Sequence, residues 1–203
     1  MNKVILIAFP QASLMGDIVE MFQNSGKDVE ILDPYLFLEQ GSNVSIPHMV
    51  FVTLDFDLRR QVINKFDQDG YARFTYVHPT ADVSANAVIG AGCFIAPFVK
   101  IFSQTTLESD CIIGPYSMVS HKCFIGQGTM CHPGTMIAGT TSIGKYCKLN
   151  MRSTVIDHLT VCDYSEIGAG AMLTKSIDIP GVYIGTPARR VKVGCMADVN
   201  ETN

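Results

Sequence analysis

The residue in this sequence best suited to acid–base chemistry is His121, in the segment Val119-Ser-His-Lys-Cys-Phe124. An exposed imidazole accepts a proton near neutral pH, which is the task of a general base. The alternative is an ordinary surface histidine in a turn, and the residues alone leave both interpretations open. The elements that would position this side chain follow from a repeat that surrounds it.

A period of six residues runs from 77 to 179 without an insertion. Every sixth position is aliphatic, with one cysteine among them: Val77, Val83, Ile89, Ile95, Ile101, Leu107, Ile113, Val119, Ile125, Cys131, Ile137, Ile143, Leu149, Val155, Val161, Ile167, Leu173 and Ile179. Small residues usually occupy the fourth position after each of these anchors. This period is the hexapeptide signature of a parallel β-helix, whose short strands stack about 4.8 Å apart around a continuous aliphatic core.

Three hexads are expected to form one coil, so residues 18 apart should stack. His121 then lies between Ser103 and Gly139, and Gly139 leaves room beside the ring. His132 stacks with Gly114, Asn150 and Gly168. It could line the same groove, although a role in the turn is favoured.

The seven cysteines indicate neither disulfides nor a metal site. Four fall on the small position and one on an anchor (Cys93, Cys111, Cys123, Cys147 and Cys131), where cysteine acts as a small buried hydrophobe in a reducing compartment. No C-x-x-C pair is present. Gamma-class carbonic anhydrases share this coil and bind zinc through three histidines, but the histidine spacing here does not match theirs. We therefore expect no metal.

Composition narrows the partners and the location. A formal charge of −4 argues against a general nucleic-acid or anionic-membrane surface. The apolar run 4–9 is too short for a signal peptide, and no stretch approaches a transmembrane helix. We expect a soluble cytoplasmic protein.

Residues 1–76 predict a separate αβ domain. Strands are expected at Val4–Phe9, Val29–Leu32, Met49–Leu54 and Arg73–Val77, with a helix closed by Gly26 and another begun by Asp55 or Asp57. This alternation predicts a small Rossmann-like parallel sheet, which binds ligands at the carboxyl ends of its strands. Ser13, Asp33 and Asp55 lie there and are candidate substrate-binding residues. The alternative is that Asp33 and Asp55 only cap turns.

The C-terminal part carries a resemblance to a known family. Ile167-Gly-Ala-Gly-Ala-Met-Leu-Thr-Lys175, then Ile179-Pro-Gly, then Ile184-Gly-Thr-Pro-Ala-Arg-Arg190 resembles the closing segment of hexapeptide acyltransferases that use acetyl-CoA. In that family the pantetheine lies in a groove between coils of neighbouring subunits, which implies a homotrimer here. Small residues would let the ligand approach the backbone, and basic ones would meet its phosphates. The implied cofactor-binding residues are Ala138, Gly139, Gly168, Ala169, Lys175, Gly185, Pro187, Arg189 and Arg190.

Residues 3–193 as a whole are similar to one branch of that family, which contains bacterial acetyltransferases of nucleotide-linked 4-amino sugars and sialic acid O-acetyltransferases. The resemblance implies a sugar-nucleotide domain at 1–76, a left-handed β-helix at 77–180, and a CoA-contacting segment with a tail at 181–203. It also implies His121 as general base, with a backbone N–H near Gly139 facing the oxyanion. The implied function is acetyl transfer from acetyl-CoA to an amino sugar in surface-glycan synthesis.

Three features depart from the branch. Relatives usually carry Asp or Glu where Lys122 stands, often a second histidine where Met130 stands, and a glycine-rich turn where this chain has the segment 8–13. Two alternatives therefore remain open. One is a non-catalytic binding or assembly protein, and the other is an O-acetyltransferase of a different small acceptor.

Overall fold

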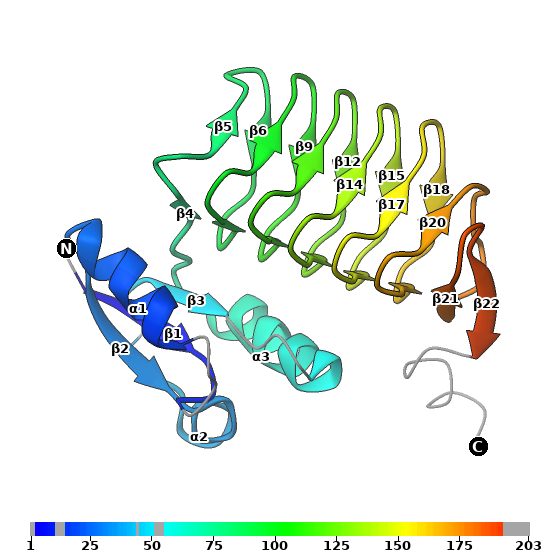
Figure 1. Cartoon of the computed structure of the whole chain (residues 1–203). Coiled ribbons are helices and arrows are strands. Elements are labelled where there is room, and N and C mark those ends of the chain that lie inside the picture. Colours follow the sequence, from blue (N-terminus) through cyan, green and yellow to red (C-terminus); the bar gives the residue numbers. More distant parts are fainter. Residues whose placement is uncertain (1–2, 11–14, 44, 51–54, 193–203) are drawn as a thin grey trace, which may run out of the picture. The chain divides into compact units, whose positions relative to one another are not determined.

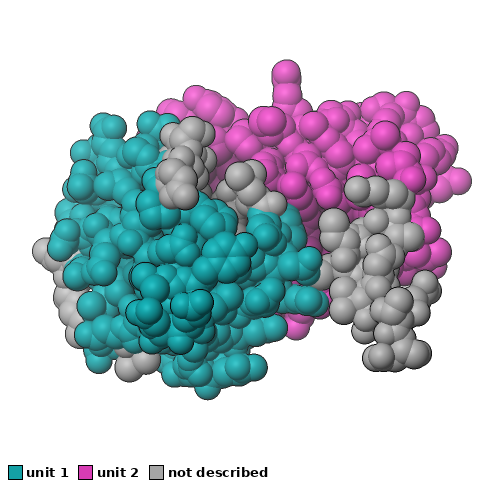
Figure 2. Space-filling view, turned by 90° about the horizontal axis from the view of Figure 1, so that it is seen from below, with its two compact units in different colours: residues 1–75 teal, residues 76–203 magenta. Residues whose placement is uncertain are grey.

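The computed structural model describes residues 3–10, 15–43, 45–50 and 55–192. The chain divides into two compact units, residues 1–75 and 76–203, coloured teal and magenta in Figure 2. Each unit is described by itself.

The first unit is a three-stranded parallel sheet with a helix after each strand (Figure 1). Its strand order is β2-β1-β3. The elements are β1 Lys3–Ile7, α1 Met15–Asn24, β2 Asp28–Leu32, α2 Pro34–Gln40, β3 His48–Val50 and α3 Phe56–Asp69. The core of the unit is mainly aliphatic, and Phe22, Phe37 and Phe66 are also completely buried.

Local sequence signals explain where two of these helices begin. The Asp33 carboxylate accepts hydrogen bonds from Tyr35 N at 2.9 Å and Leu36 N at 3.3 Å, and Pro34 supplies the fixed φ of a first helical position. Asp55 caps α3 in the same way, accepting from Leu58 N at 2.9 Å.

The structure changes two of the predictions for this unit. Helix α2 was not predicted, because seven residues are too few to show a helical period. The predicted strand Arg73–Val77 is wrong as part of this sheet. Arg73 forms only an isolated bridge with His48, and the strand β4, Tyr76–Val77, belongs to the second unit. The last four residues of the predicted strand Met49–Leu54 lie outside the described residues.

The second unit is a left-handed parallel β-solenoid of about six turns, as the hexads predicted. Strands 18 residues apart pair in register and form three faces. Face 1 contains β4 Tyr76–Val77, β7 Phe94–Ile95, β10 Ile112–Ile113, β13 Met130–Cys131, β16 Lys148–Leu149, β19 Glu166–Ile167, β21 Val182–Ile184 and β22 Arg189–Lys192. Face 2 contains β5 Asp82–Val83, β8 Lys100–Ile101, β11 Met118–Val119, β14 Met136–Ile137, β17 Thr154–Val155 and β20 Met172–Leu173. Face 3 contains β6 Val88–Ile89, β9 Thr106–Leu107, β12 Phe124–Ile125, β15 Ser142–Ile143 and β18 Thr160–Val161.

The predicted anchors form the interior of the solenoid. Each one from Ile95 to Leu173 is at most 2 % exposed. The turns between faces place a residue in the left-handed region every six positions, whether or not it is glycine: Lys122 has φ 57° and His158 has φ 58°. The period ends earlier than predicted, because Ile179 is exposed and forms no strand, while Ile177 bridges to Val161 instead.

The small position of each hexad has a more specific role than small size. Where this position carries a hydroxyl or a thiol, the group usually donates to the carbonyl oxygen 15 residues later; Ser153, whose Oγ has no partner among the described residues, is an exception. Thr129 Oγ1 donates to Gly144 O at 2.8 Å, and Cys147 Sγ donates to Cys162 O at 3.2 Å. Burial raises the pKa of the Cys147 thiol to about 12, so this cysteine remains a protonated structural donor.

Candidate active site

His121 lies in the turn between β11 and β12, where face 2 meets face 3, and it is exposed. We call the turn residues 120–122, 138–140 and 156–158, from three successive coils, the His121 corner. The imidazole lies directly against the Cα of Gly139: a Cβ added at Gly139 would be 2.7 Å from its Cε1 and 2.8 Å from its Nε2. The stacking predicted from the 18-residue coil is therefore confirmed, and Gly139 is the residue type that this ring position requires.

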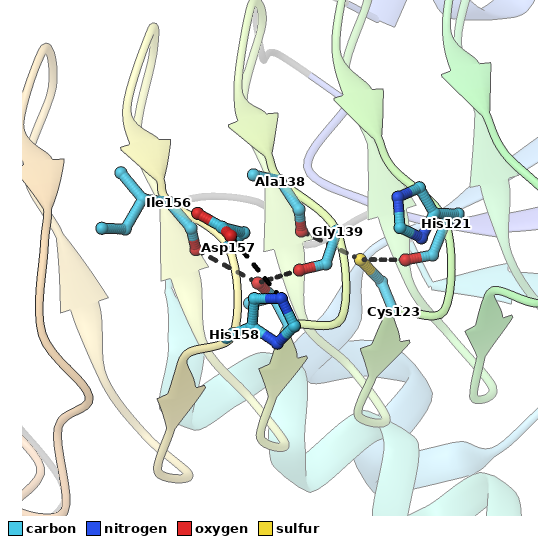
Figure 3. A network of polar contacts seen from close by, with 8 residues as sticks. His121, Cys123, Ala138, Gly139, Ile156, Asp157 and His158 are labelled. Carbon is cyan, nitrogen blue, oxygen red and sulfur yellow. Dashed lines mark hydrogen bonds and ion pairs between the residues drawn. The ribbon is translucent and has the colours of Figure 1, made fainter.

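Hydrogen bonds between coils fix the backbone of the corner (Figure 3). Thr140 N donates to His121 O at 2.9 Å, and His158 N donates to Gly139 O at 3.0 Å. Behind the ring, Cys123 Sγ donates to Ala138 O at 3.2 Å. Burial raises the pKa of the Cys123 thiol, which makes it a poor nucleophile. His121 is therefore the group at this turn that can exchange a proton with a ligand.

The main chain beside the ring offers a hydrogen-bond donor. The carbonyl of Gly139 is used by His158 N, but its N–H has no acceptor among the described residues. An amide N–H next to an imidazole can hold a developing negative charge while the imidazole moves a proton. These two groups are the minimum that acyl transfer needs.

His132 lies elsewhere, in the turn between β13 and β14 where face 1 meets face 2. It therefore lies at a different corner of the solenoid from His121. Burial is the main cause that lowers the pKa of His132; Lys148 lowers it further, and Glu166 opposes the effect. Its Nε2 is buried without a hydrogen-bond partner among the described residues. A neutral, enclosed imidazole fits the turn role that the sequence favoured.

The predicted cofactor-binding residues do not gather at one place. Ala138 and Gly139 belong to the His121 corner, whereas Gly168 and Ala169 lie in the turn between β19 and β20, from face 1 to face 2. Gly168 has a packing reason to be small, because an added Cβ would be 2.6 Å from Ile184 Cγ2.

The C-terminal segment runs beside the end of face 2. Gly185 O accepts from Met172 N at 3.0 Å, and Ala188 N donates to Met172 O at 2.8 Å, which places Pro187 next to β20. Arg190 donates to Pro180 O from Nε at 3.2 Å and from a terminal nitrogen at 3.0 Å. Arg189 is exposed and donates to Ala188 O, and Lys175 is exposed one coil beyond Asp157. Their contact with a cofactor stays a prediction.

The candidate residues of the first unit are only partly described. Asp33 and Asp55 are helix caps, which was the alternative considered for them, and their substrate role stays a prediction. Ser13 lies outside the described residues. Asp157 was not among the residues predicted from the sequence, although the same 18-residue step that places Gly139 on His121 leads one coil further to it.

The chain has the hexapeptide-repeat β-helix fold of acetyltransferases. It is similar to the acetyltransferase domain of PglB from Neisseria gonorrhoeae, with a TM-score of 0.83, 21 % identity and coverage of 94 % of this chain and 100 % of that one. It is also similar to PerB from Caulobacter crescentus, solved with CoA and GDP-perosamine, with a TM-score of 0.77, 24 % identity and coverage of 94 % and 97 %. At these identities the likeness shows the fold alone.

Curated relatives match over shorter parts of their own chains. The UDP-3-O-acylglucosamine N-acyltransferase of Janthinobacterium sp. (strain Marseille) is 31 % identical over 121 residues, which are 60 % of this chain and 31 % of that one. The bifunctional protein GlmU of Anaplasma marginale (strain Florida) is 23 % identical, over 82 % of this chain and 46 % of its own. The chain thus spans less than half the length of each. No family model matches it.

Residues 3–10, 15–43, 45–50 and 55–192 contain neither a metal-binding cluster nor a membrane-spanning helix. No cluster of three or more His, Cys, Asp or Glu residues there could hold a metal ion. None of the helices in the same ranges has the length and apolar character needed to cross a membrane.

Proposed function

We propose that this chain is an acetyl-CoA-dependent acetyltransferase whose acceptor is a nucleotide-linked amino sugar, in a cytoplasmic step of surface-glycan synthesis. The observation that carries the proposal is the His121 imidazole lying on Gly139 at an exposed corner of the solenoid, beside a Gly139 N–H that has no acceptor among the described residues. Support comes from PerB, a protein of the same fold, which was solved with CoA and GDP-perosamine.

The chemistry needs only these two groups and the two substrates. The acceptor nitrogen attacks the thioester carbonyl carbon, a C–N bond forms, and His121 takes the N–H proton. The carbonyl oxygen becomes an oxyanion, held by the Gly139 N–H. The C–S bond then breaks, the carbonyl re-forms, and the CoA sulfur leaves with the proton returned by the imidazolium. The products are an N-acetyl sugar and free CoA.

The cofactor path extends from the His121 corner toward the C-terminal end of the solenoid. Ala138 and Gly139 would flank the acetyl end, and Lys175 lies further along the same corner. Gly185, Pro187, Arg189 and Arg190 would meet the nucleotide end. A groove of this kind is completed by a second subunit in the family that the sequence resembles, so we propose a homotrimer.

The first unit would bind the nucleotide sugar as a small Rossmann-like domain. Asp33 directly follows β2 and Asp55 precedes α3, and parallel sheets of this kind bind ligands at the carboxyl ends of their strands, which supports the proposal. Ser13 belongs to the same proposal.

A non-catalytic binding or assembly role is the second candidate. The observation that favours it is Lys122, a cation next to the proposed base, where the resembled branch carries a carboxylate. An O-acetyltransferase of another small acceptor would use the same two groups.

The test is thiol release from acetyl-CoA with a panel of UDP-, GDP- and dTDP-linked amino sugars. Each acceptor is paired with its deaminated, hydroxyl-bearing analogue, which separates N- from O-acetylation. We expect turnover with at least one amino sugar. Absence of turnover with every acceptor, together with absence of CoA binding by calorimetry, would support the non-catalytic candidate.

A further inference from the structure

One column of turn residues continues past the proposed base. Stepping by 18 along the His121 corner gives Ser103, His121, Gly139, Asp157 and Lys175. The bonds from Thr140 N to His121 O and from His158 N to Gly139 O hold the three central coils together. With coils about 4.8 Å apart, the Cα atoms of His121 and Asp157 are roughly 10 Å apart.

Gly139 leaves room for the His121 ring on the coil between these two residues. Gly139, the residue between them, has no side chain, and the imidazole leans over it with Cε1 and Nε2 nearest to the missing Cβ. Figure 3 shows His121 and Asp157 on either side of Gly139, from three successive coils. The ring therefore extends from its own coil toward the coil that carries Asp157.

The charges at this corner are unbalanced around the base. Lys122 follows His121 in the same turn. Asp157 is the one carboxylate among the described residues of the His121 corner, and its Oδ2 is 3.6 Å from His158 Nε2. The imidazole of His121 has no hydrogen bond to any described residue. An imidazolium formed next to Lys122 needs a counter-charge, and Asp157 is the group placed to provide it.

We propose that Asp157 is a positioning residue for His121, taking the place of the carboxylate that Lys122 replaces. Its carboxylate accepts a hydrogen bond from the imidazole N–H through one bridging water across Gly139. This bond orients the ring while the other ring nitrogen takes the acceptor proton, and the negative charge stabilises the imidazolium. The inference rests on the acetyl-transfer function proposed above.

The test is the pH dependence of acetyl transfer in Asp157→Asn, measured with acetyl-CoA and the best acceptor of the panel. Removing the charge makes His121 a weaker base, so kcat on the neutral plateau should fall about 10-fold. The acidic limb of the kcat/KM profile should also move to lower pH by about half a unit, because the imidazolium has lost its counter-charge. The KM for acetyl-CoA should stay within about twofold.

The matched control is Asp82→Asn, which removes the same charge from a carboxylate of similar exposure on face 2, 69 % against 64 % for the Asp157 side chain. Asp82→Asn should keep the wild-type kcat on the neutral plateau and the wild-type position of the acidic limb of the kcat/KM profile. Equal pH profiles for Asp157→Asn and Asp82→Asn would overturn the inference. So would a lower kcat plateau in Asp157→Asn with an unmoved acidic limb, because a purely structural defect gives that result.

A second measurement separates this inference from the function on which it rests. The NMR signals of the His121 ring protons, followed against pH in the ligand-free protein, should shift their midpoint to lower pH in Asp157→Asn but not in Asp82→Asn. If no acceptor is acetylated, the proposed function fails and the NMR midpoint still decides the role of Asp157. If His121→Ala abolishes turnover and Asp157→Asn changes neither measurement, only the inference fails.

Discussion

At the scale of the residue, the site depends on one contact, that of the His121 ring with the Cα of Gly139. Any side chain at Gly139 would come within 3 Å of the ring atoms Cε1 and Nε2. Gly139 has no positive φ, so its backbone would accept alanine without strain. The contact alone therefore determines the residue type.

Gly139→Ala should displace the imidazole and leave the fold intact. We expect kcat to fall by about 10²-fold, the cost typical of a misplaced catalytic group, with little change in the melting temperature. The matched control is Gly16→Ala in α1, where an added Cβ meets nothing within 4 Å. Activity of Gly139→Ala equal to that of Gly16→Ala would show that the ring position is unimportant.

At the scale of the element, the hydrogen bonds of the small hexad position hold neighbouring coils together. Thr129 Oγ1 donates to Gly144 O at 2.8 Å and accepts from Cys147 N at 2.9 Å. Thr129→Val keeps the shape of the side chain and loses both hydrogen bonds. The buried Cys147 N–H and Gly144 carbonyl oxygen are then left without this partner. We expect the free energy of unfolding to fall by about 1–3 kcal/mol, measured by urea denaturation.

Thr129→Ser is the matched variant, since it keeps the hydroxyl. It should lie much closer to wild type than Thr129→Val does. If the valine variant were the more stable of the two, the coils would be held by apolar packing alone.

A second prediction at this scale concerns the packing of helices α2 and α3 around His48. Its ring is completely buried against Phe37, Phe66 and Tyr71. Burial lowers the pKa of His48, against smaller opposing effects of the Ile46 backbone and Glu30. Above the ordinary histidine value near 6.5, the side chain is neutral in both the folded and the unfolded state. Below that value the unfolded chain binds a proton that the folded unit resists, so the stability of the first unit should fall as the pH drops.

Urea denaturation at pH 7.5 and pH 5.5 checks this prediction. His48→Leu should be less sensitive to the change of pH than the wild type, whereas replacing the exposed His158 by Gln should keep the wild-type sensitivity. An identical pH response of wild type and His48→Leu would exclude His48 as the cause.

The sequence predicted the solenoid well because each hexad is a local unit that is buried only by its copies. The first unit was predicted less completely. Helix α2 is short, so its amphipathic period could not be recognised, although Asp33-Pro34 carried a helix-start signal. His121 was a candidate from its residue type and segment, the resemblance implied its role as general base, and the 18-residue step predicted Gly139 as its neighbour. Gly168 and Gly139 lie apart because they occupy turns between different pairs of faces, face 1 to face 2 for Gly168 and face 2 to face 3 for Gly139. The assignment of strands to faces is needed to see this.

At the scale of the whole molecule, the proposal joins a solenoid that would hold acetyl-CoA with a parallel αβ unit that would hold the acceptor. The likeness to PglB and PerB extends over 94 % of this chain, so both units take part in it. The relatives matched by sequence, in contrast, are covered over less than half their length. Under the proposed function, the acceptor is best sought among nucleotide sugars that would bind to the first unit.

The most direct test of the account is the acetyl-transfer rate of His121→Ala relative to wild type, with CoA affinity measured by calorimetry on the same preparations. The account predicts a loss of about 10²–10⁴-fold in kcat with CoA affinity nearly unchanged, while His78→Gln keeps the wild-type rate. Wild-type turnover by His121→Ala would contradict it, because the other imidazole of the His121 corner, His158, is not the ring that lies against Gly139.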